Sequence, residues 1–385
     1  MNFTASKNKT TRWTAEQVAG LAGVAIPQMR KITAADVIPA IPELMLWDMW
    51  PVEYCDGSVV EINNWEIWVI MCAPHDLHPD ERHNVARLRL AMYRNGKWRD
   101  CGHLLPDDLN PGAREWAGST VFDPQTGALT LFYTATGRRG EVKHSFEQRL
   151  FQTTGHLLVQ DDIVSATGWS DPFENIISDD HHYMVAREVD GRAGFIKAFR
   201  DPYHFRDPAD GNDYLLFTAS LKASTSEHNG IVGIAVATGD GFTEWTLLPP
   251  LLSADALNNE MERPVLRVHN GLYYAFWSTQ KRTFAPDGPV GPNGLYGMVA
   301  DTLFGPYRPL NGTGLVAANP LDEPVQTYSW WVTQDLEVAG FIDHWGLAGR
   351  SLEDHPQLVT SQFGGTPAPR FRIALNGDTA HIVTL

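Results

Sequence analysis

Cysteine and long apolar runs are both scarce in this sequence. The three cysteines, Cys55, Cys72 and Cys101, match no metal-ligand spacing and leave at least one thiol unpaired, so neither a disulfide framework nor a zinc site is indicated. No stretch approaches about 18 uninterrupted apolar residues, and the N-terminus MNFTASKNKTTRWTAEQ lacks the apolar segment of a cleavable signal peptide. We therefore expect a soluble protein that makes no membrane contact.

Positive charge is also in short supply. The chain has 30 Lys and Arg residues against 46 Asp and Glu residues, a formal net charge of -16. This is the wrong sign for a protein that must displace counterions from nucleic acid phosphates, so we expect no nucleic acid partner. Aromatic residues, in contrast, are abundant, with 13 Trp, 17 Phe and 11 Tyr. They supply a large core and leave rings for a cleft that would suit sugars.

The order of patterns along the chain favours one large all-β domain over residues 1–385. All-β propellers often run this long as a single unit. The first forty residues are the exception, because Thr14 is followed three residues later by Gln17, and Thr33 by Asp36. Both spacings resemble capping boxes, so we expect short helices packed outside the main body over residues 1–40.

The rest of the chain consists of short β-like runs separated by Gly, Pro, Asn and Asp. Three runs end in small residues after an aromatic pair: LFYTATG (131–137), LLFTASL (215–221) and YYAFWST (273–279). Their spacing of roughly sixty to eighty residues would suit four-stranded blades with insertions, which favours a β-propeller over a sandwich. HDLHPDERHN (75–84) and APDGPVGPNG (285–294) are predicted to be exposed loops.

Carboxylates stand at unexpected places in this β pattern. LWDMWPV (46–52) puts Asp48 between two tryptophans, where an ionised carboxylate is costly unless partners reach it. In FRDP, the proline favours an extended Asp201 that projects from a strand end beside Arg200. In NEMERP, Glu260 and Glu262 would face one side of an extended strand. Two such close charges would raise one pKa, as a general acid working near neutrality requires.

Each of these residues has an ordinary structural alternative. Asp201 could begin an Asp-Pro turn, the glutamate pair could be a solvated salt-bridge patch, and Trp116 of AREWAGS could be a core residue. Asp48 could be a turn aspartate flanked by core tryptophans. The combination nevertheless favours glycosidic chemistry. A retaining glycosidase needs a carboxylate nucleophile and a carboxylic acid about 5 to 5.5 Å apart, and Asp48 and Glu262 could fill these roles.

At this point the sequence resembles the bacterial levansucrases and related fructosyltransferases of glycoside hydrolase family 68. The resemblance rests on motifs that follow one another in order through most of the chain: RWTAEQ, LWDMWPV, EWAGS, FRDP, NEMERP, LYGMVADTLFGPY (295–307), NGTGLV (311–316) and QTYSW (326–330). It implies a five-bladed β-propeller with a deep, acidic central pocket. It also implies sucrose as the fructosyl donor.

The resemblance assigns a role to each residue that matches a family motif. Asp48 would be the nucleophile of a covalent fructosyl-enzyme, Glu262 the acid/base and Asp201 the transition-state stabiliser. The remaining matched positions would bind substrate: Trp47 and Trp116 as walls of the fructosyl subsite, Arg200 and Glu260 on sugar hydroxyls, Tyr328 beside the acid/base, and Gln280 at the rim of the acceptor subsite.

The resemblance also bears on metals, partners and location. In Gram-positive relatives, an Asp that opens the acid/base motif helps to bind a structural calcium. This chain has Asn259 there, so we expect no metal, and no other cofactor is implied. The expected partners are sucrose and fructan or fructo-oligosaccharide acceptors, with the oligomeric state open. We expect an extracellular or periplasmic location reached without a cleavable signal peptide, with the cytoplasm as the alternative.

Three alternatives compete with a fructan-forming transferase. A mainly hydrolytic β-fructofuranosidase, or an inulosucrase of the same family, would share every catalytic residue. A non-catalytic carbohydrate-binding propeller would need only the aromatic residues, but the presence of all three carboxylates argues against it. A metal protein is suggested by DDHHY (179–183) and HDLH (75–78), although such clusters on polar loops are usually solvated.

Overall fold

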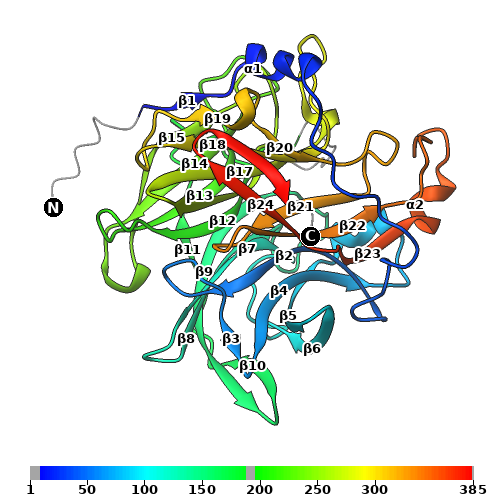
Figure 1. Ribbon diagram of the computed structural model, residues 1–385. Coiled ribbons are helices and arrows are strands. Elements are labelled where there is room, and N and C mark those ends of the chain that lie inside the picture. Colours follow the sequence, from blue (N-terminus) through cyan, green and yellow to red (C-terminus); the bar gives the residue numbers. More distant parts are fainter. Residues whose placement is uncertain (1–8, 188–195, 384–385) are drawn as a thin grey trace.

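Five β-sheet blades surround a central axis in a computed structural model that describes residues 9–187 and 196–383 (Figure 1). Hydrogen bonds join the strands into one ten-stranded and three five-stranded sheets. The ten-stranded sheet contains two blades, which are linked by a short parallel pairing of Val52 with Thr120 and of Glu53 with Val121. The predicted five-bladed propeller is therefore confirmed.

The blades follow one another in chain order, and the first strand of each lies nearest the axis. The first two contain β2 (Leu44–Glu53), β3 (Glu61–Ile62), β4 (Trp65–Pro74), β5 (Arg87–Arg94) and β6 (Lys97–His103), then β7 (Arg114–Asp123), β8 (Ala128–Thr136), β9 (Gln148–Gln160), β10 (Ile163–Thr167) and β11 (Phe173–Ile176). The third contains β12 (Phe199–Arg206), β13 (Asp213–Ser220), β14 (Gly230–Ala237), β15 (Trp245–Ser253) and the N-terminal β1 (Thr11–Arg12).

The last two blades are formed by the C-terminal part of the chain. They contain β16 (Glu262–His269), β17 (Leu272–Thr279), β18 (Gly294–Ala300), β19 (Arg308–Pro309) and β20 (Leu315–Ala318), then β21 (Thr327–Val332), β22 (Glu337–His344), β23 (Phe363–Pro367), β24 (Phe371–Asn376) and β25 (Thr379–Val383). The first strands contact one another in the ring order β2, β7, β12, β16, β21 and back to β2, which closes the propeller.

The predicted repeat corresponds to one strand position in three successive blades. LFYTATG, LLFTASL and YYAFWST fall on β8, β13 and β17, the second strand of each blade. These strands are buried on both faces, since blades pack on each other face to face. Burial on both faces explains why their apolar residues run continuously instead of alternating.

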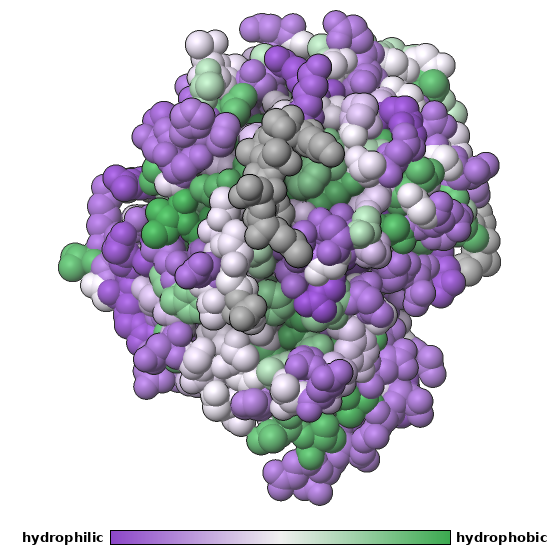
Figure 2. All heavy atoms as spheres, turned by 90° about the vertical axis from the view of Figure 1, so that its left-hand side faces the viewer, coloured by the Kyte–Doolittle hydropathy of each residue, from purple (hydrophilic) through white to green (hydrophobic). Residues whose placement is uncertain are grey.

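The helices are few and short. The α-helices are α1 (Ala15–Ala19) and α2 (Gln357–Ser361), and the 3-10 helices are η2 (Gly20–Gly23), η3 (Pro79–Asn84), η4 (Asp240–Phe242), η5 (Lys281–Thr283) and η6 (Leu310–Gly312). Among the described residues, no helix is long and apolar enough to cross a membrane. On the face shown in Figure 2, hydrophilic residues dominate and apolar residues form scattered patches.

The N-terminal segment follows the prediction in its first half and departs from it in its second. The capping box of Thr14 and Gln17 forms and begins α1, which lies outside the blades (Figure 1). The predicted helix after Thr33 is wrong, because this stretch is a turn. The Asp36 carboxylate accepts hydrogen bonds from the backbone and hydroxyl of Thr33 and pairs with Arg30, and these local bonds replace a helical turn.

Candidate active site

All five first strands are interrupted by a shift in pairing register. The shifts lie between Leu46 and Met49 in β2, Trp116 and Gly118 in β7, Arg200 and Tyr203 in β12, Glu262 and Val265 in β16, and Tyr328 and Trp331 in β21. A bulge re-aims the side chains beside it and ends regular pairing. Repetition of the bulge around the ring turns polar side chains from separate blades toward one point.

A cavity of about 340 Å³ opens at this point. It is lined by every residue that the sequence predicts for the site: Trp47, Asp48, Trp116, Arg200, Asp201, Glu260, Glu262, Gln280 and Tyr328. These residues come from β2, β7, β12, β16 and β21 and from the segments that flank β16 and β17. The structure therefore brings together residues that lie up to about 280 positions apart in the sequence, as closure of a propeller ring requires.

Arg200 is the hub of the charged groups in the cavity. One of its terminal nitrogens, Nη2, lies 2.7 Å from Glu262 Oε1 and 3.3 Å from Glu260 Oε1, while Nε lies 3.5 Å from Asp201 Oδ2. These three carboxylates raise the pKa of the Arg200 guanidinium further, against the effect of burial. One cation thus serves three carboxylates, and the site keeps a surplus of negative charge.

Asp48 has a different cation. Its Oδ2 lies 3.8 Å from Nη1 of Arg263, whose guanidinium also donates hydrogen bonds to the Ser329 hydroxyl and the Met49 carbonyl. Burial raises the pKa of Asp48, while Arg263 and a hydrogen bond with Ser329 oppose that rise. The buried carboxylate in the apolar run is therefore stabilised by residues of two other first strands, β16 and β21.

Asp201 corrects one prediction about the backbone. It does not adopt the extended conformation expected before proline, since its φ is 59° and it lies inside the bulge of β12. Two threonines hold it there, with the Thr134 hydroxyl on its backbone N–H and the Thr218 hydroxyl donating to Oδ2 at 2.9 Å. Burial raises the pKa of Asp201 to about 6, although Arg200 acts in the opposite direction.

The predicted glutamate pair shares the Arg200 guanidinium, and Tyr328 reaches the same group. The hydroxyl of Tyr328 donates a hydrogen bond to Glu262 Oε2, so both oxygens of Glu262 have donors. Burial, followed by the charge of Glu262, raises the pKa of Glu260 to about 7. The two close glutamates were predicted to raise the pKa of one of them, and this residue is Glu260.

The aromatic wall of the cavity contains a residue that the sequence analysis missed. The His83 ring lies 5.6 Å from Trp47 and 6.0 Å from Trp116, both in edge-on contacts, and its carbonyl accepts from Trp116 Nε1. Burial, together with the nearby Arg82 guanidinium, lowers the pKa of His83 well below its ordinary value. A neutral imidazole therefore completes the wall between the two tryptophans.

The position of His83 corrects the prediction for residues 75–84. They do not form a simple exposed loop, because Pro79–Asn84 folds as the 3-10 helix η3 and lines the cavity with Asp80, Arg82 and His83. A signal was present in the sequence, since proline followed by acidic residues is a typical helix start. Arg82 also stacks over Trp47 at 5.9 Å.

Two further residues of the wall carried no signal of their own. Asp343 lies near the end of β22 and lines the cavity with Arg282 of η5. Although burial acts to raise the pKa of Asp343, His344 at 2.8 Å and the charges of Arg82 and Arg282 lower it overall. Their place in the cavity depends on long-range packing, which a single sequence does not display.

A divalent metal does not fit the surroundings of Asn259. Its side-chain oxygen accepts a hydrogen bond from the Lys197 ammonium at 3.2 Å, and the same ammonium contacts Asn229 Oδ1 and the Glu227 carbonyl. Calcium sites use carboxylates among their oxygen ligands and have no room for a second cation. The donor set around Asn259 is already organised around a positive charge of the protein.

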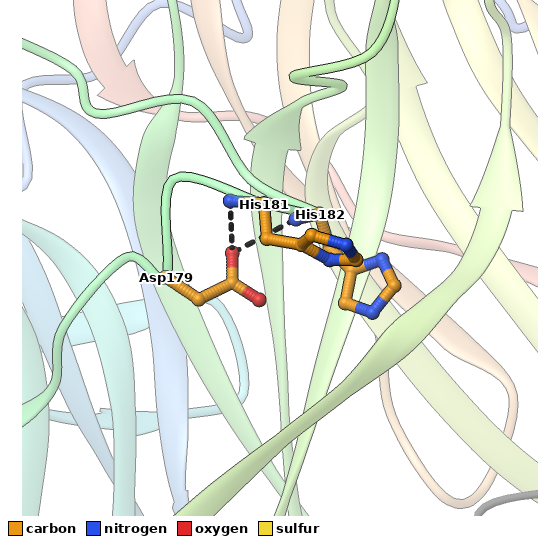
Figure 3. A group of neighbouring side chains, drawn as sticks. All are labelled: Asp179, His181 and His182. Carbon is orange, nitrogen blue, oxygen red and sulfur yellow. Dashed lines mark hydrogen bonds between the residues drawn. The ribbon is translucent and has the colours of Figure 1, made fainter.

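The DDHHY loop does bring ligand-type groups together, as the metal alternative requires. One ligand atom each of Asp179, His181 and His182 lies within 4.8 Å of the others. Figure 3 shows the carboxylate of Asp179 turned toward the backbone of the two histidines. One carboxylate oxygen accepts hydrogen bonds from the N–H groups of His181, His182 and Tyr183. These bonds account for the arrangement as a capped turn on a largely exposed loop.

Comparisons with known proteins agree on the family of this chain. A family model described as Levansucrase/Invertase matches residues 1–230 and 222–385. A levansucrase of Zymomonas mobilis is 32% identical, over 88% of this chain and 82% of the relative, and levansucrase LscC of Pseudomonas savastanoi is 30% identical over 91% and 85%. A solved inulosucrase of Halalkalicoccus jeotgali bound to kestose is 40% identical, covers 97% of this chain and 95% of its own, and superposes with a TM-score of 0.88.

Proposed function

Since this chain belongs to the Levansucrase/Invertase family, glycoside hydrolase family 68, we propose that it carries the fructosyl unit of sucrose through a covalent intermediate on Asp48. It is a fructosyltransferase. The observation that supports the residue roles is the meeting of Asp48, Asp201 and Glu262 in one cavity, where Arg200 is shared by Asp201 and Glu262. The catalytic unit is a single domain, because β1 and Trp13 of the N-terminal segment are built into the third and fourth blades.

The first half of the reaction breaks the glycosidic bond. An Asp48 oxygen attacks the anomeric carbon of the fructosyl unit and forms a new carbon–oxygen bond, while the bond to the glucose oxygen breaks. Glu262 donates its proton to that oxygen, and glucose leaves. Asp201 accepts hydrogen bonds from fructose hydroxyls as positive charge develops on the sugar ring. Arg200 and Tyr328 hold Glu262 in place through both carboxylate oxygens.

The second half transfers the fructosyl unit to an acceptor. Glu262, now ionised, takes the proton of an acceptor hydroxyl whose oxygen attacks the anomeric carbon and releases Asp48. The acceptor is the hydroxyl of a sugar or of a growing fructan, or water. Gln280 lines the cavity beside Tyr328 and can hydrogen-bond an incoming sugar with its amide. Glu262 gives one proton to the glucose oxygen in the first half and takes one from the acceptor in the second. It therefore ends the cycle in its starting state.

Incubation of the purified protein with sucrose tests the function. We expect glucose to be released, and free fructose not to exceed it. Any fructose that is not free should be recovered in oligosaccharides or polymer by chromatography. Absence of glucose release from a folded protein would refute the proposal. In that case, sucrose binding measured by calorimetry would support the alternative of a carbohydrate-binding propeller without activity.

The type of product is a second question on which the comparisons divide. The curated relatives named above are levansucrases, whereas the solved protein with 40% identity is an inulosucrase. That higher identity favours an inulin-type product as the second candidate function, and a mainly hydrolytic enzyme remains the third. Linkage analysis of the product by NMR distinguishes levan from inulin, and the ratio of free fructose to glucose measures hydrolysis. Assay of culture fractions for the activity tests an extracellular or periplasmic location.

A further inference from the structure

Lys197 is a buried lysine whose charge is enclosed by oxygen atoms. Its side chain is 6% exposed. The ammonium donates hydrogen bonds to the Glu227 carbonyl at 2.6 Å, to Asn229 Oδ1 at 3.1 Å and to Asn259 Oδ1 at 3.2 Å, and it lies 3.3 Å from the Glu227 carboxylate oxygen Oε2. We call these oxygens with Lys197 the ammonium cage. Burial of an ammonium is costly, so a cage of this kind indicates a position at which the fold needs a fixed positive charge.

The ammonium cage is joined directly to the segment that carries the acid/base. Asn259 is fully buried and immediately precedes Glu260, and its amide also donates to the Ile196 carbonyl at 3.0 Å. The backbone of Asn259 donates to Thr283. Gly230 packs so closely on Asn259 that an added Cβ would lie 2.7 Å from its carbonyl. Lys197 therefore fixes Asn259 from one side while the backbone contacts fix it from the others.

A second connection runs from the backbone of Lys197 to Arg200. Gln148 donates from Nε2 to the Lys197 carbonyl at 2.9 Å. The other end of the same amide, Oε1, accepts from the Phe199 N–H at 3.1 Å and from Arg200 Nη1 at 3.4 Å. Lys197 thus lies between the two groups whose separation matters for the acid/base, namely Arg200 on β12 and the Glu260–Glu262 segment that opens β16.

We propose that Lys197 is a positioning residue, which supplies from the chain itself the cation that holds the Asn259–Glu262 segment against Arg200. The ammonium joins oxygen atoms of two segments, residues 227–229 and Asn259, as a bound metal ion would, but without dependence on metal supply. Lys197 touches no reacting atom. It acts on Glu262 through Asn259 and Glu260.

The test compares Lys197→Met with Lys222→Met. Both changes remove an ammonium and keep most of the stem, but Lys222 is 41% exposed and pairs with Asp180 at the surface. The two donors are sucrose and an activated fructoside whose leaving group needs no proton. Because the inference rests on the proposed role of Glu262, we expect Lys197→Met to lower kcat for sucrose by about ten- to a hundredfold and kcat for the activated donor much less. Lys222→Met should match the wild type on both.

A double-mutant cycle keeps the inference testable if Lys197→Met folds poorly. Asn259→Leu removes the acceptor and leaves the lysine in place. Since both residues act through one contact, Lys197→Met combined with Asn259→Leu should lower kcat and Tm little more than the worse single change. In the wild type, neither a chelator nor added calcium should shift Tm.

Three results would overturn the inference. These are equal losses on both donors, fully additive losses in the cycle, and a calcium-dependent rise in the Tm of the wild type. The glucose released from sucrose by the wild type is measured in the same assay and judges the proposed function separately. Were the wild type inactive, the Tm cycle alone would still decide whether Lys197 and Asn259 act as one unit.

Discussion

The first strands of the blades carry charged groups at both ends, and the two ends use them in opposite ways. At the cavity, Arg200 is shared by Asp201, Glu260 and Glu262. Further along the same strands, one carboxylate, Glu53 of β2, meets one guanidinium, Arg267 of β16. We call the group around Glu53 and Arg267 the closed end. The difference is one of charge balance, since carboxylates outnumber cations at the cavity and match them at the closed end.

The closed end is saturated with hydrogen bonds. Glu53 Oε1 accepts from Arg267 Nη2 at 2.5 Å and from Trp331 Nε1 at 3.2 Å. The remaining nitrogens of Arg267 donate to the Val332 carbonyl and the Tyr203 hydroxyl. Both charged side chains are almost fully buried. A paired and bonded carboxylate of this kind has no capacity left for a substrate and acts as a structural link between blades.

The comparison teaches that unbalanced charge marks the reactive end. Burial raises the pKa of Asp48, Asp201 and Glu260 at the cavity, and it raises that of Glu53 as well. Burial by itself therefore does not separate the two ends. What separates them is the number of cations and donors for each carboxylate, together with an open cavity into which the carboxylates at one end project.

The largest expected effect is the loss of glucose release in Asp48→Asn. An amide cannot form the fructosyl ester, so glucose release from sucrose should fall by about 10⁴-fold or more. The fold should persist, because Asn has nearly the same shape as Asp and the side chain of Asp48 is 23% exposed. Rates near those of the wild type in a folded variant would remove Asp48 from the role of nucleophile.

The next effect is expected for Glu262→Gln. Loss of the acid/base should lower kcat for sucrose by about 10²- to 10⁴-fold. An activated fructoside needs no protonation of its leaving group, so its first half-reaction should recover much of this loss. Burst kinetics of leaving-group release measure that step directly. Equal damage to both donors would show that Glu262 is not the acid.

At the closed end, the matching change should damage stability and spare the chemistry. Glu53→Gln leaves the buried Arg267 without its charge partner, which should lower the free energy of unfolding by about 3–5 kcal/mol. The kcat of the folded enzyme should change little. Asp301→Asn is the control, since Asp301 and its partner Arg308 are both well exposed and their pairing contributes little. A large fall in kcat with little change in the free energy of unfolding of Glu53→Gln would contradict the comparison between the two ends.

A smaller and pH-dependent effect is expected for Asp201→Asn. The pKa of Asp201 is raised from 3.8 to about 6, so between these pH values the folded protein holds a proton that the unfolded chain has released. The free energy of unfolding of the wild type therefore falls as the pH rises through this window. Asn cannot titrate and still accepts from Thr218. The variant should gain about 2–3 kcal/mol at pH 7 relative to the wild type, and no such gain should remain below about pH 4.

Urea unfolding of both proteins at pH 4 and pH 7 measures this difference. The activity of Asp201→Asn should be strongly reduced above about pH 6, where Asp201 of the wild type is ionised, because the transition state loses a carboxylate. A variant that is less stable than the wild type at pH 7 would show that the ionised Asp201 carboxylate stabilises the fold, as we expect for Glu53.

The smallest effect concerns the acceptor. Gln280 offers uncharged hydrogen bonds, which are weaker than charge-assisted ones. Gln280→Arg and Gln280→His should hold an acceptor sugar more firmly and raise the ratio of transfer to hydrolysis a few-fold, with little change in total glucose release. Chromatography at matched sucrose concentrations gives this ratio. An unchanged ratio in both variants would remove Gln280 from the acceptor site.

Local patterns were sufficient for much of the fold, and the resemblance to the family supplied the full set of site residues. Short β-like runs between turn residues predicted the strands, and the family motifs predicted which side chains line the cavity. The errors lie where long-range packing overrides a local pattern. The stretch after Thr33 forms a turn held by Arg30, and Asp201 is held in a left-handed conformation by Thr134 and Thr218.

The sequence by itself determined an acidic, all-β chain with three carboxylates in fructosyltransferase motifs, because composition, periodicity and motif order are properties of neighbouring residues. The tertiary structure decided which cation serves which carboxylate, that η3 forms a wall of the cavity, and that Lys197 lies behind Asn259. Most of these contacts join residues of different blades. They exist only once the ring of first strands has closed and its bulges have turned the side chains toward a common point.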